Sequence, residues 1–185
     1  YMHYVNQLVL SGEINDVGGF IRTNSGKSFR MGIELSALAK VSKFLELSGN
    51  LNLSKNENID FRQEGTNGIE TLGNTPISFS PNTVANLLVN IKPFSNFSLG
   101  IQNQYVGEQY LDNTNNPDLK LNDYFLTDLN AQYDLKLNRT DVALKLLVNN
   151  LFNRNYVSNG YVWEGPIYYS QAGTNFLFGI SLKFR

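Results

Sequence analysis

The sequence predicts an all-β protein of antiparallel strands that form a transmembrane β-barrel, and three observations lead to this fold class. Apolar and polar residues alternate with a period of two in seven segments, which is typical of strands with one apolar face. Most of these segments run for about ten residues, the length that a membrane-spanning strand needs. The connections between them are alternately long and short, as in outer-membrane barrels with brief turns on one side and extended loops on the other.

Eight strands are expected in all. The first, residues 1–11, is the least regular. The second, residues 28–40, is the clearest, because Phe29, Met31 and Ile33 fall on one face while Arg30 and Glu34 fall on the other. The same alternation predicts six further strands. In chain order they are residues 44–54, 85–91, 97–105, 125–135, 142–149 and 176–184.

The connections predict which end of the sheet carries recognition. Short turns are expected at KVSK, PFSN and KLNRT. Because outer-membrane barrels place their long loops outside the cell, the long connections should form the outer surface, and both chain ends should lie on the short-turn side. The long connections are residues 12–28, 55–81, 108–123 and 150–173.

Composition excludes several classes of function. The 185 residues carry a net charge of −1, which gives no electrostatic footprint for nucleic acid. The chain has no cysteine and one histidine, His3, so a Ser-His or Cys-His nucleophile is not expected. The carboxylates of loop 55–81 lack the spacing of a calcium loop. They are Glu57, Asp60, Glu64 and Glu70. We therefore predict no enzyme activity, no metal site and no cofactor.

A soluble β-sandwich that binds a ligand is the alternative fold, because one-sided alternation does not say whether the apolar face meets lipid or a second sheet. Strand length and the order of long and short connections favour the membrane barrel. Aromatic residues near strand ends, such as Phe44, Tyr105 and Tyr124, also fit the two membrane interfaces.

The segment after the penultimate strand reads NNLFNRNY, and the chain closes with YYSQAGTNFLFGISLKF before Arg185. Asn and other turn residues bond to their own backbone and tolerate left-handed conformations, so NNLFN can end a strand cleanly. Phe152 and Tyr156 are then expected to cover the base of the loop. A packed turn is the favoured interpretation of these residues over substrate contact.

This ending resembles that of TonB-dependent outer-membrane receptors of the siderophore type, in which an N-L-F-x-x-x-Y signature precedes a final strand that ends on Phe. Asn150, Leu151, Phe152 and Tyr156 match the signature, and Phe184 matches the closing aromatic. Arg185 after that aromatic departs from the pattern. The specific resemblance covers the last ~45 residues, a length typical of a few strands and their loops.

The resemblance implies that residues 1–185 form the C-terminal segment of a barrel of about twenty-two strands. A plug domain and the earlier strands would lie outside this chain and before Tyr1. The implied partners are outer-membrane lipid, the plug and remaining strands, the TonB energy-coupling protein through regions outside this chain, and a scarce small-molecule or metal-chelate substrate such as an iron–siderophore complex. The implied location is the outer membrane of a Gram-negative bacterium.

Exposed aromatic side chains in the long loops are the candidates for substrate contact, because rigid aromatic surfaces bind flat or amphipathic ligands at modest entropic cost. They would equally serve to pack neighbouring loops. These candidates are Tyr110, Tyr161, Trp163, Tyr168 and Tyr169.

A self-contained eight-stranded barrel with a structural, adhesive or small-channel role remains the alternative function. An open sheet in lipid leaves backbone groups unpaired at two edges, at a cost of several kcal/mol for each group. The predicted sheet must therefore close on itself or pair with strands outside this chain.

Overall fold

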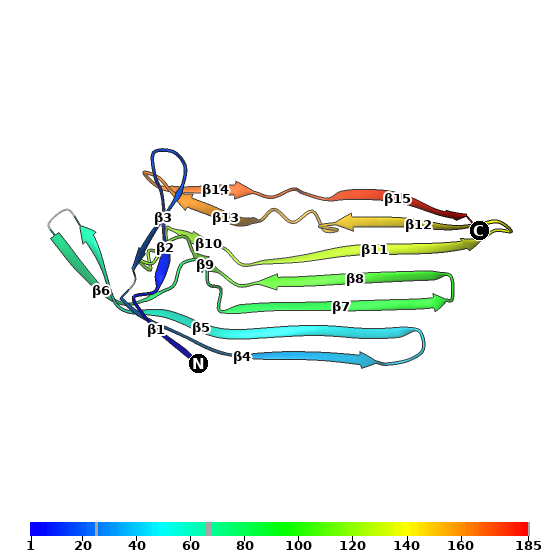
Figure 1. Cartoon of the computed structure of the whole chain (residues 1–185), viewed down its shortest axis with the longest axis horizontal. Helices are drawn as coiled ribbons and strands as arrows, with labels where there is room; N and C mark the ends of the chain where they lie inside the picture. The colour runs from blue at the N-terminus through cyan, green and yellow to red at the C-terminus, as the bar shows by residue number, and fades with distance from the viewer. Residues whose placement is uncertain (25, 66–67, 185) are drawn as a thin grey trace.

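The computed structural model describes residues 1–24, 26–65 and 68–184, so Arg185 lies outside the described residues. Eight antiparallel strands lie side by side in one layer in the order β1-β4-β5-β7-β8-β11-β12-β15 (Figure 1). Their bounds are β1 Met2–Val5, β4 Lys27–Lys40, β5 Leu45–Gly65, β7 Thr83–Phe94, β8 Phe97–Val106, β11 Tyr124–Lys136, β12 Thr140–Asn149 and β15 Asn175–Phe184. The number of strands in this layer agrees with the prediction.

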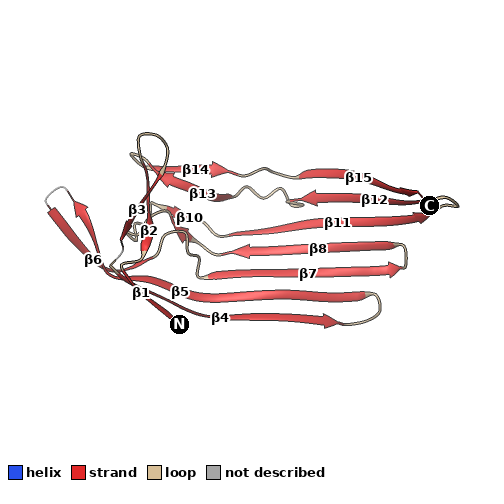
Figure 2. Cartoon of the chain, in the orientation of Figure 1, coloured by secondary structure: helices blue, strands red, loops and turns tan. Residues whose placement is uncertain are grey.

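The remaining strands gather at the long-loop end of the layer (Figure 2). β2 (Leu8–Ile14), β3 (Phe20–Asn24), β13 (Val157–Val162) and β14 (Pro166–Ser170) form a four-stranded sheet in the order β14-β13-β2-β3. β9 (Gln109–Tyr110) pairs with β10 (Lys120–Leu121), and β6 (Gly68–Pro76) pairs with the far half of β5. The described residues include no helix that is long and apolar enough to cross a membrane.

The strand register turns the predicted alternation into two distinct faces. One row of cross-strand neighbours is wholly apolar, and the next row is mostly polar. The apolar row is Ala39, Leu47, Val89, Ile101, Leu129, Val148 and Phe176. The polar row is Lys40, Glu46, Asn90, Gly100, Asn130, Leu147 and Leu177.

Large apolar side chains of the first face are widely exposed. Ile33, Phe178 and Phe184 have 63%, 64% and 75% of their surface accessible. A contiguous apolar surface of this extent marks a membrane or protein contact. The apolar face of the eight-stranded layer, called the wall below, is thus suited to lipid.

The first predicted strand, residues 1–11, is wrong as a single element. Asn6 adopts a left-handed backbone conformation, with φ of 57°, and this separates β1 from β2. β1 pairs with β4 so that Met2 faces Arg30, near the long-loop end of β4. The N-terminus consequently lies toward the loops, whereas the C-terminus lies by the short turns as predicted (Figure 1).

The long connections are largely folded into strands, which the sequence analysis did not predict. Loop 55–81 contains the far half of β5 and all of β6. Loop 12–28 contains the end of β2 and all of β3, loop 150–173 contains the β13–β14 hairpin, and loop 108–123 contains β9 and β10. Together these elements form a folded cap at one end of the wall.

The buried side chains of the described residues are concentrated at this cap. The buried apolar residues are Phe61, Ile77, Val106, Leu111, Leu121 and Leu126. They lie in the cap or in the strand ends next to it. Within the described residues, the wall has no comparable buried core, and its strands are joined by hydrogen-bonded ladders.

The wall is open at both edges within the described residues. β1 pairs there only with β4, and β15 only with β12, so no ladder joins the two edges. Unpaired strand edges are unfavourable in lipid.

Candidate functional site

Asn150 closes the turn after β12. It is 4% exposed and has a left-handed φ of 50°. Its Oδ1 accepts a hydrogen bond from the Arg154 N–H at 2.8 Å, and its Nδ2 donates to the carbonyls of Arg154 and Ala172 at 2.9 and 3.2 Å. The Asn150 N–H donates to Asp128 Oδ1 at 2.7 Å, and its carbonyl accepts from the Thr174 hydroxyl at 2.7 Å. One side chain thus joins the start of loop 150–173 to its end.

Of the other signature residues, two contact neighbouring strands and two are exposed to solvent or lipid. The Leu151 N–H donates to the carbonyl of Thr127 at 2.8 Å, which attaches the turn to β11. The ring of Tyr156 lies 4.8 Å from that of Tyr124, so it covers the loop base as expected. Phe152 is 73% exposed, so it packs little against that base. Phe184 is 75% exposed at the short-turn end.

The β13–β14 hairpin carries four of the five candidate aromatics. The rings of Tyr161 and Tyr169 lie 5.7 Å apart on one face of the hairpin. Tyr168 lies on the other face, opposite Gly160 in the ladder. Trp163 lies at the tip, with 46% of its surface exposed. The hairpin therefore presents aromatic surface on both faces and at its tip.

Tyr110, the fifth candidate, lies in β9 and not in that hairpin. It pairs with Lys120 in the short β9–β10 ladder. Its carbonyl accepts a hydrogen bond from the Phe79 N–H at 2.9 Å, and the residue is half-buried. This placement assigns Tyr110 to the packing between two loops.

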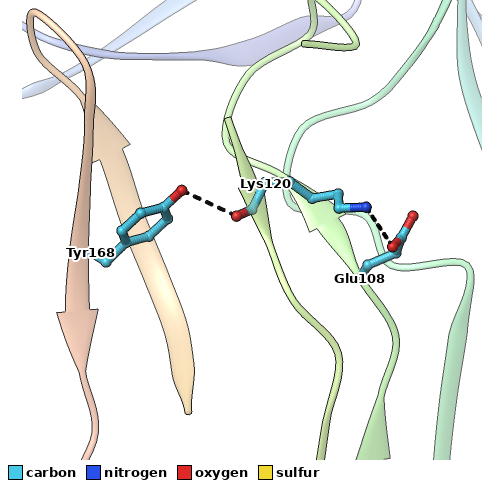
Figure 3. Close-up of polar contacts among 3 residues, drawn as sticks. All are labelled: Glu108, Lys120 and Tyr168. Atoms are coloured by element: carbon cyan, nitrogen blue, oxygen red, sulfur yellow. Dashed lines mark hydrogen bonds and ion pairs between the residues drawn. The ribbon is translucent and has the colours of Figure 1, made fainter. Parts of the chain in front are cut away.

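Lys120 connects three segments of the cap, namely β10, β14 and the turn that precedes β9 (Figure 3). Its Nζ lies 2.7 Å from Glu108 Oε2, and its carbonyl accepts a hydrogen bond from the Tyr168 hydroxyl at 3.2 Å. The hydrogen bond to Glu108 raises the pKa of the Lys120 ammonium. The ion pair is exposed, so it orients the side chain more than it stabilises the fold.

A cavity of about 430 Å³ opens between β10 and the β13–β14 hairpin. Its lining mixes charged, amide and aromatic groups. The lining includes Lys120, Asp123, Arg154, Tyr156, Tyr168 and Gln171. A concave site with a few convergent polar groups and aromatic walls is suited to a small molecule. Of the five predicted aromatics, only Tyr168 lines it.

A buried core beneath the cap holds the loops in place. Leu111 and Leu121 are 0% and 1% exposed. Asn113 Oδ1 accepts hydrogen bonds from the Ser78 N–H at 3.0 Å and from Asn58 Nδ2 at 3.2 Å. Asn58 is fully buried, and its Oδ1 has no partner within the described structure. Such a group is costly in a packed interior.

Asp112 lies at the edge of this core. It is 7% exposed, and its carboxylate accepts hydrogen bonds from the N–H and hydroxyl of Thr114 at 3.0 and 2.8 Å. Burial raises the pKa of Asp112, and the bonds from Thr114 offset only part of that rise.

The first and last hairpins of the chain also meet in the cap. Val162 of β13 pairs with Glu13 of β2 in a parallel bridge. This contact joins loops that are about 150 residues apart in a chain of 185 residues. It brings the β2–β3 hairpin beside the aromatic β13–β14 hairpin.

The carboxylates of loop 55–81 do not gather around a common point. Glu57 pairs with Lys55 at 2.9 Å, and the side chain of Glu64 is outside the described set. Among the described residues, no three His, Asp or Glu side chains lie close enough to hold a metal ion.

The sequence analysis did not predict the polar residues that line the cavity. They are Lys120, Asp123, Arg154 and Gln171. These residues lie in segments 120–123, 154–157 and 168–171, which approach one another only through the fold. The aromatic content of loop 150–173 was the one local signal.

Comparison with known proteins identifies the family of the chain. Residues 1–151 match a model described as TonB dependent receptor-like, beta-barrel. No curated protein matches the chain.

Solved structures share the fold at low sequence identity. The ferric-catecholate import receptor Fiu from E. coli K12 is 18% identical with a TM-score of 0.67, over 97% of this chain and 23% of that one. The siderophore receptor PiuA from Acinetobacter baumannii is 18% identical with a TM-score of 0.70, over 96% and 24%. The copper transporter OprC is 17% identical with a TM-score of 0.66, over 98% and 27%. The chain thus spans about a quarter of the length of these structures, and the predicted fold class is confirmed.

Proposed function

Because the chain belongs to the TonB-dependent receptor-like β-barrel family, we propose that it forms part of the wall and the outer loops of an active transporter. The transporter lies in the outer membrane of a Gram-negative bacterium and imports a scarce substrate such as an iron–siderophore complex. Residues 1–185 act as the C-terminal segment of its barrel. The plug domain, the earlier strands and the TonB-coupling region belong to other parts of the same polypeptide.

The open wall is the observation that carries this proposal. One of its faces exposes apolar side chains, and β1 and β15 each have a neighbour on one side only within the described structure. Such a sheet needs lipid against its apolar face and further strands against its edges. Strands from the rest of a larger barrel meet both needs.

The cap provides the outer recognition surface. Its cavity is lined by Lys120, Arg154 and Tyr168, beside the exposed aromatics of β13 and β14. This segment binds and guides the substrate and carries out no chemical step. A soluble ferric chelate with aromatic or charged groups matches such a lining.

The intact mass of the native polypeptide, purified from its outer-membrane fraction, tests the proposal. We expect a mass several times the 20.9 kDa of this chain, because a barrel of about twenty-two strands needs many more residues. A native mass near 20.9 kDa would contradict the proposal and leave a self-contained barrel.

Uptake of iron-55 supplied as a ferric catecholate or a ferric hydroxamate tests the role of the cavity. Arg154→Gln and Tyr168→Ala should reduce uptake of one chelate by about tenfold, equivalent to the loss of one good polar or aromatic contact. Phe152→Leu is the matched control, since Phe152 is exposed and lies outside the cavity. Equal uptake by all variants would place substrate binding elsewhere.

A further inference from the structure

Two opposite charges line the cavity between β10 and the β13–β14 hairpin without an ion pair to any described residue. They are the guanidinium of Arg154 and the carboxylate of Asp123. The third charged residue of the lining, Lys120, is neutralised by Glu108 at 2.7 Å (Figure 3). The cavity thus offers one cation and one anion to a bound molecule.

The fold places these two charges in adjacent segments. Asp123 directly precedes Tyr124, and Arg154 lies two residues before Tyr156. The rings of Tyr124 and Tyr156 are 4.8 Å apart, so the segments that carry the two charges lie side by side. Asp123 accepts a hydrogen bond from the Tyr105 hydroxyl, and an ionised carboxylate has further acceptor sites for a ligand.

The rest of the lining is mostly uncharged and able to form hydrogen bonds. Its polar groups come from Asn122, Asn155, Tyr156, Tyr168, Ser170 and Gln171. The two loops around the cavity, residues 108–123 and 150–173, contain five acidic and two basic residues. This distribution of charge disfavours a molecule that carries several negative charges.

We propose that the cavity selects a metal chelate that carries both a carboxylate and an ammonium group, the two groups of a free amino acid. Arg154 binds the carboxylate, for which its planar guanidinium is suited, and Asp123 binds the ammonium. A chelate with only one of these groups would bring its charge close to the like charge of the other residue. The inference rests on the proposed function and names the substrate class of the same cavity.

A set of matched ligands tests this selectivity on the purified full-length polypeptide in detergent. Ferrioxamine B is a ferric trihydroxamate with one terminal amine. The amine is left free, acetylated, succinylated or joined to the side-chain carboxyl of glutamate. The products carry an ammonium alone, neither group, a carboxylate alone, or both groups on the same chelate. Isothermal titration calorimetry measures the affinity of each.

The glutamyl derivative should bind most tightly. Arg154→Gln should weaken its binding about tenfold, the loss of one charge-assisted hydrogen bond, without weakening the binding of the ammonium derivative. Asp123→Asn should weaken the glutamyl derivative by a similar factor without weakening the carboxylate derivative. A purely structural role for either residue would instead weaken all four ligands alike.

Matched controls come from the β5–β6 hairpin. Arg62→Gln and Asp60→Asn make the same chemical changes at exposed residues outside the cavity. Both controls should keep the affinities of the original protein for all four ligands.

Equal affinities for the four ligands, no binding of any of them, or an equal loss for all four in both variants would overturn the inference. Iron-55 uptake from another chelate, together with a native mass several times 20.9 kDa, would then still support the proposed function. A native mass near 20.9 kDa would remove both.

Discussion

The wall and the cap of this molecule are stabilised in different ways. The wall consists of regular antiparallel ladders whose side chains stay exposed, as with Ile33 and Phe178. The cap has a buried core around Leu111 and left-handed residues such as Asn150 that hold its loops. The wall thus depends on its surroundings for stability, whereas the cap supplies its own interior. A substitution should therefore be judged by the region in which it lies.

Leu111→Ala should have the largest effect, about 4 kcal/mol in the stability of the cap, because it leaves a cavity around a fully buried side chain. Urea unfolding and protease cleavage within residues 108–121 measure the loss. Leu35→Ala is the wall control, since Leu35 is 58% exposed and its truncation leaves no enclosed cavity. Equal losses for the two variants would remove the distinction between the regions.

Val89→Arg should cost about 3 kcal/mol, because a charge on the lipid face of a barrel is unfavourable near the bilayer centre. Asn90→Arg, one residue along on the polar face, should cost much less. The two variants are compared by refolding the full-length polypeptide into phosphatidylcholine vesicles. The folded fraction is then measured from its gel mobility before and after heating. If Asn90→Arg were the more damaging change, the two faces would be assigned the wrong way round.

Asn150→Ala should destabilise loop 150–173 by about 2 kcal/mol, because it removes the side-chain bonds to Arg154 and Ala172 and leaves a strained left-handed residue. Hydrogen exchange of residues 150–174 should become faster while that of β12 changes little. The exposed neighbour Asn155, changed to Ala, is the control. Unchanged exchange in Asn150→Ala would show that the turn is held by its backbone alone.

The smallest effect concerns pH. Burial raises the pKa of Asp112 above its ordinary value of 3.8, so folding favours the protonated carboxyl. Its contribution to cap stability is full below that ordinary value and is lost as the pH rises through the raised pKa. Asp112→Asn should flatten this dependence, measured as protease cleavage near residue 112 from pH 4 to pH 7. If cleavage of the variant changed with pH as steeply as that of the original protein, the pH dependence would belong to another group.

The two regions also differ in how well the sequence predicts them. Seven of the eight predicted wall strands agree with the structure, because alternation such as that of residues 28–40 is local and directly readable. The first strand was wrong because Asn6 breaks it. In the cap, aromatic composition marked loop 150–173 correctly as distinctive but did not predict its hairpin or its cavity.

By itself the sequence determined the strands, their two faces, the short turns and the signature around Asn150, since each depends on residues within a few positions of one another. Only the tertiary structure decided which loops meet. The bridge between Val162 and Glu13, the cavity beside Lys120 and the pairing of Leu147 with Leu177 join segments far apart in the chain. Such contacts depend on strand register and on the folded path of the loops, which no local pattern encodes.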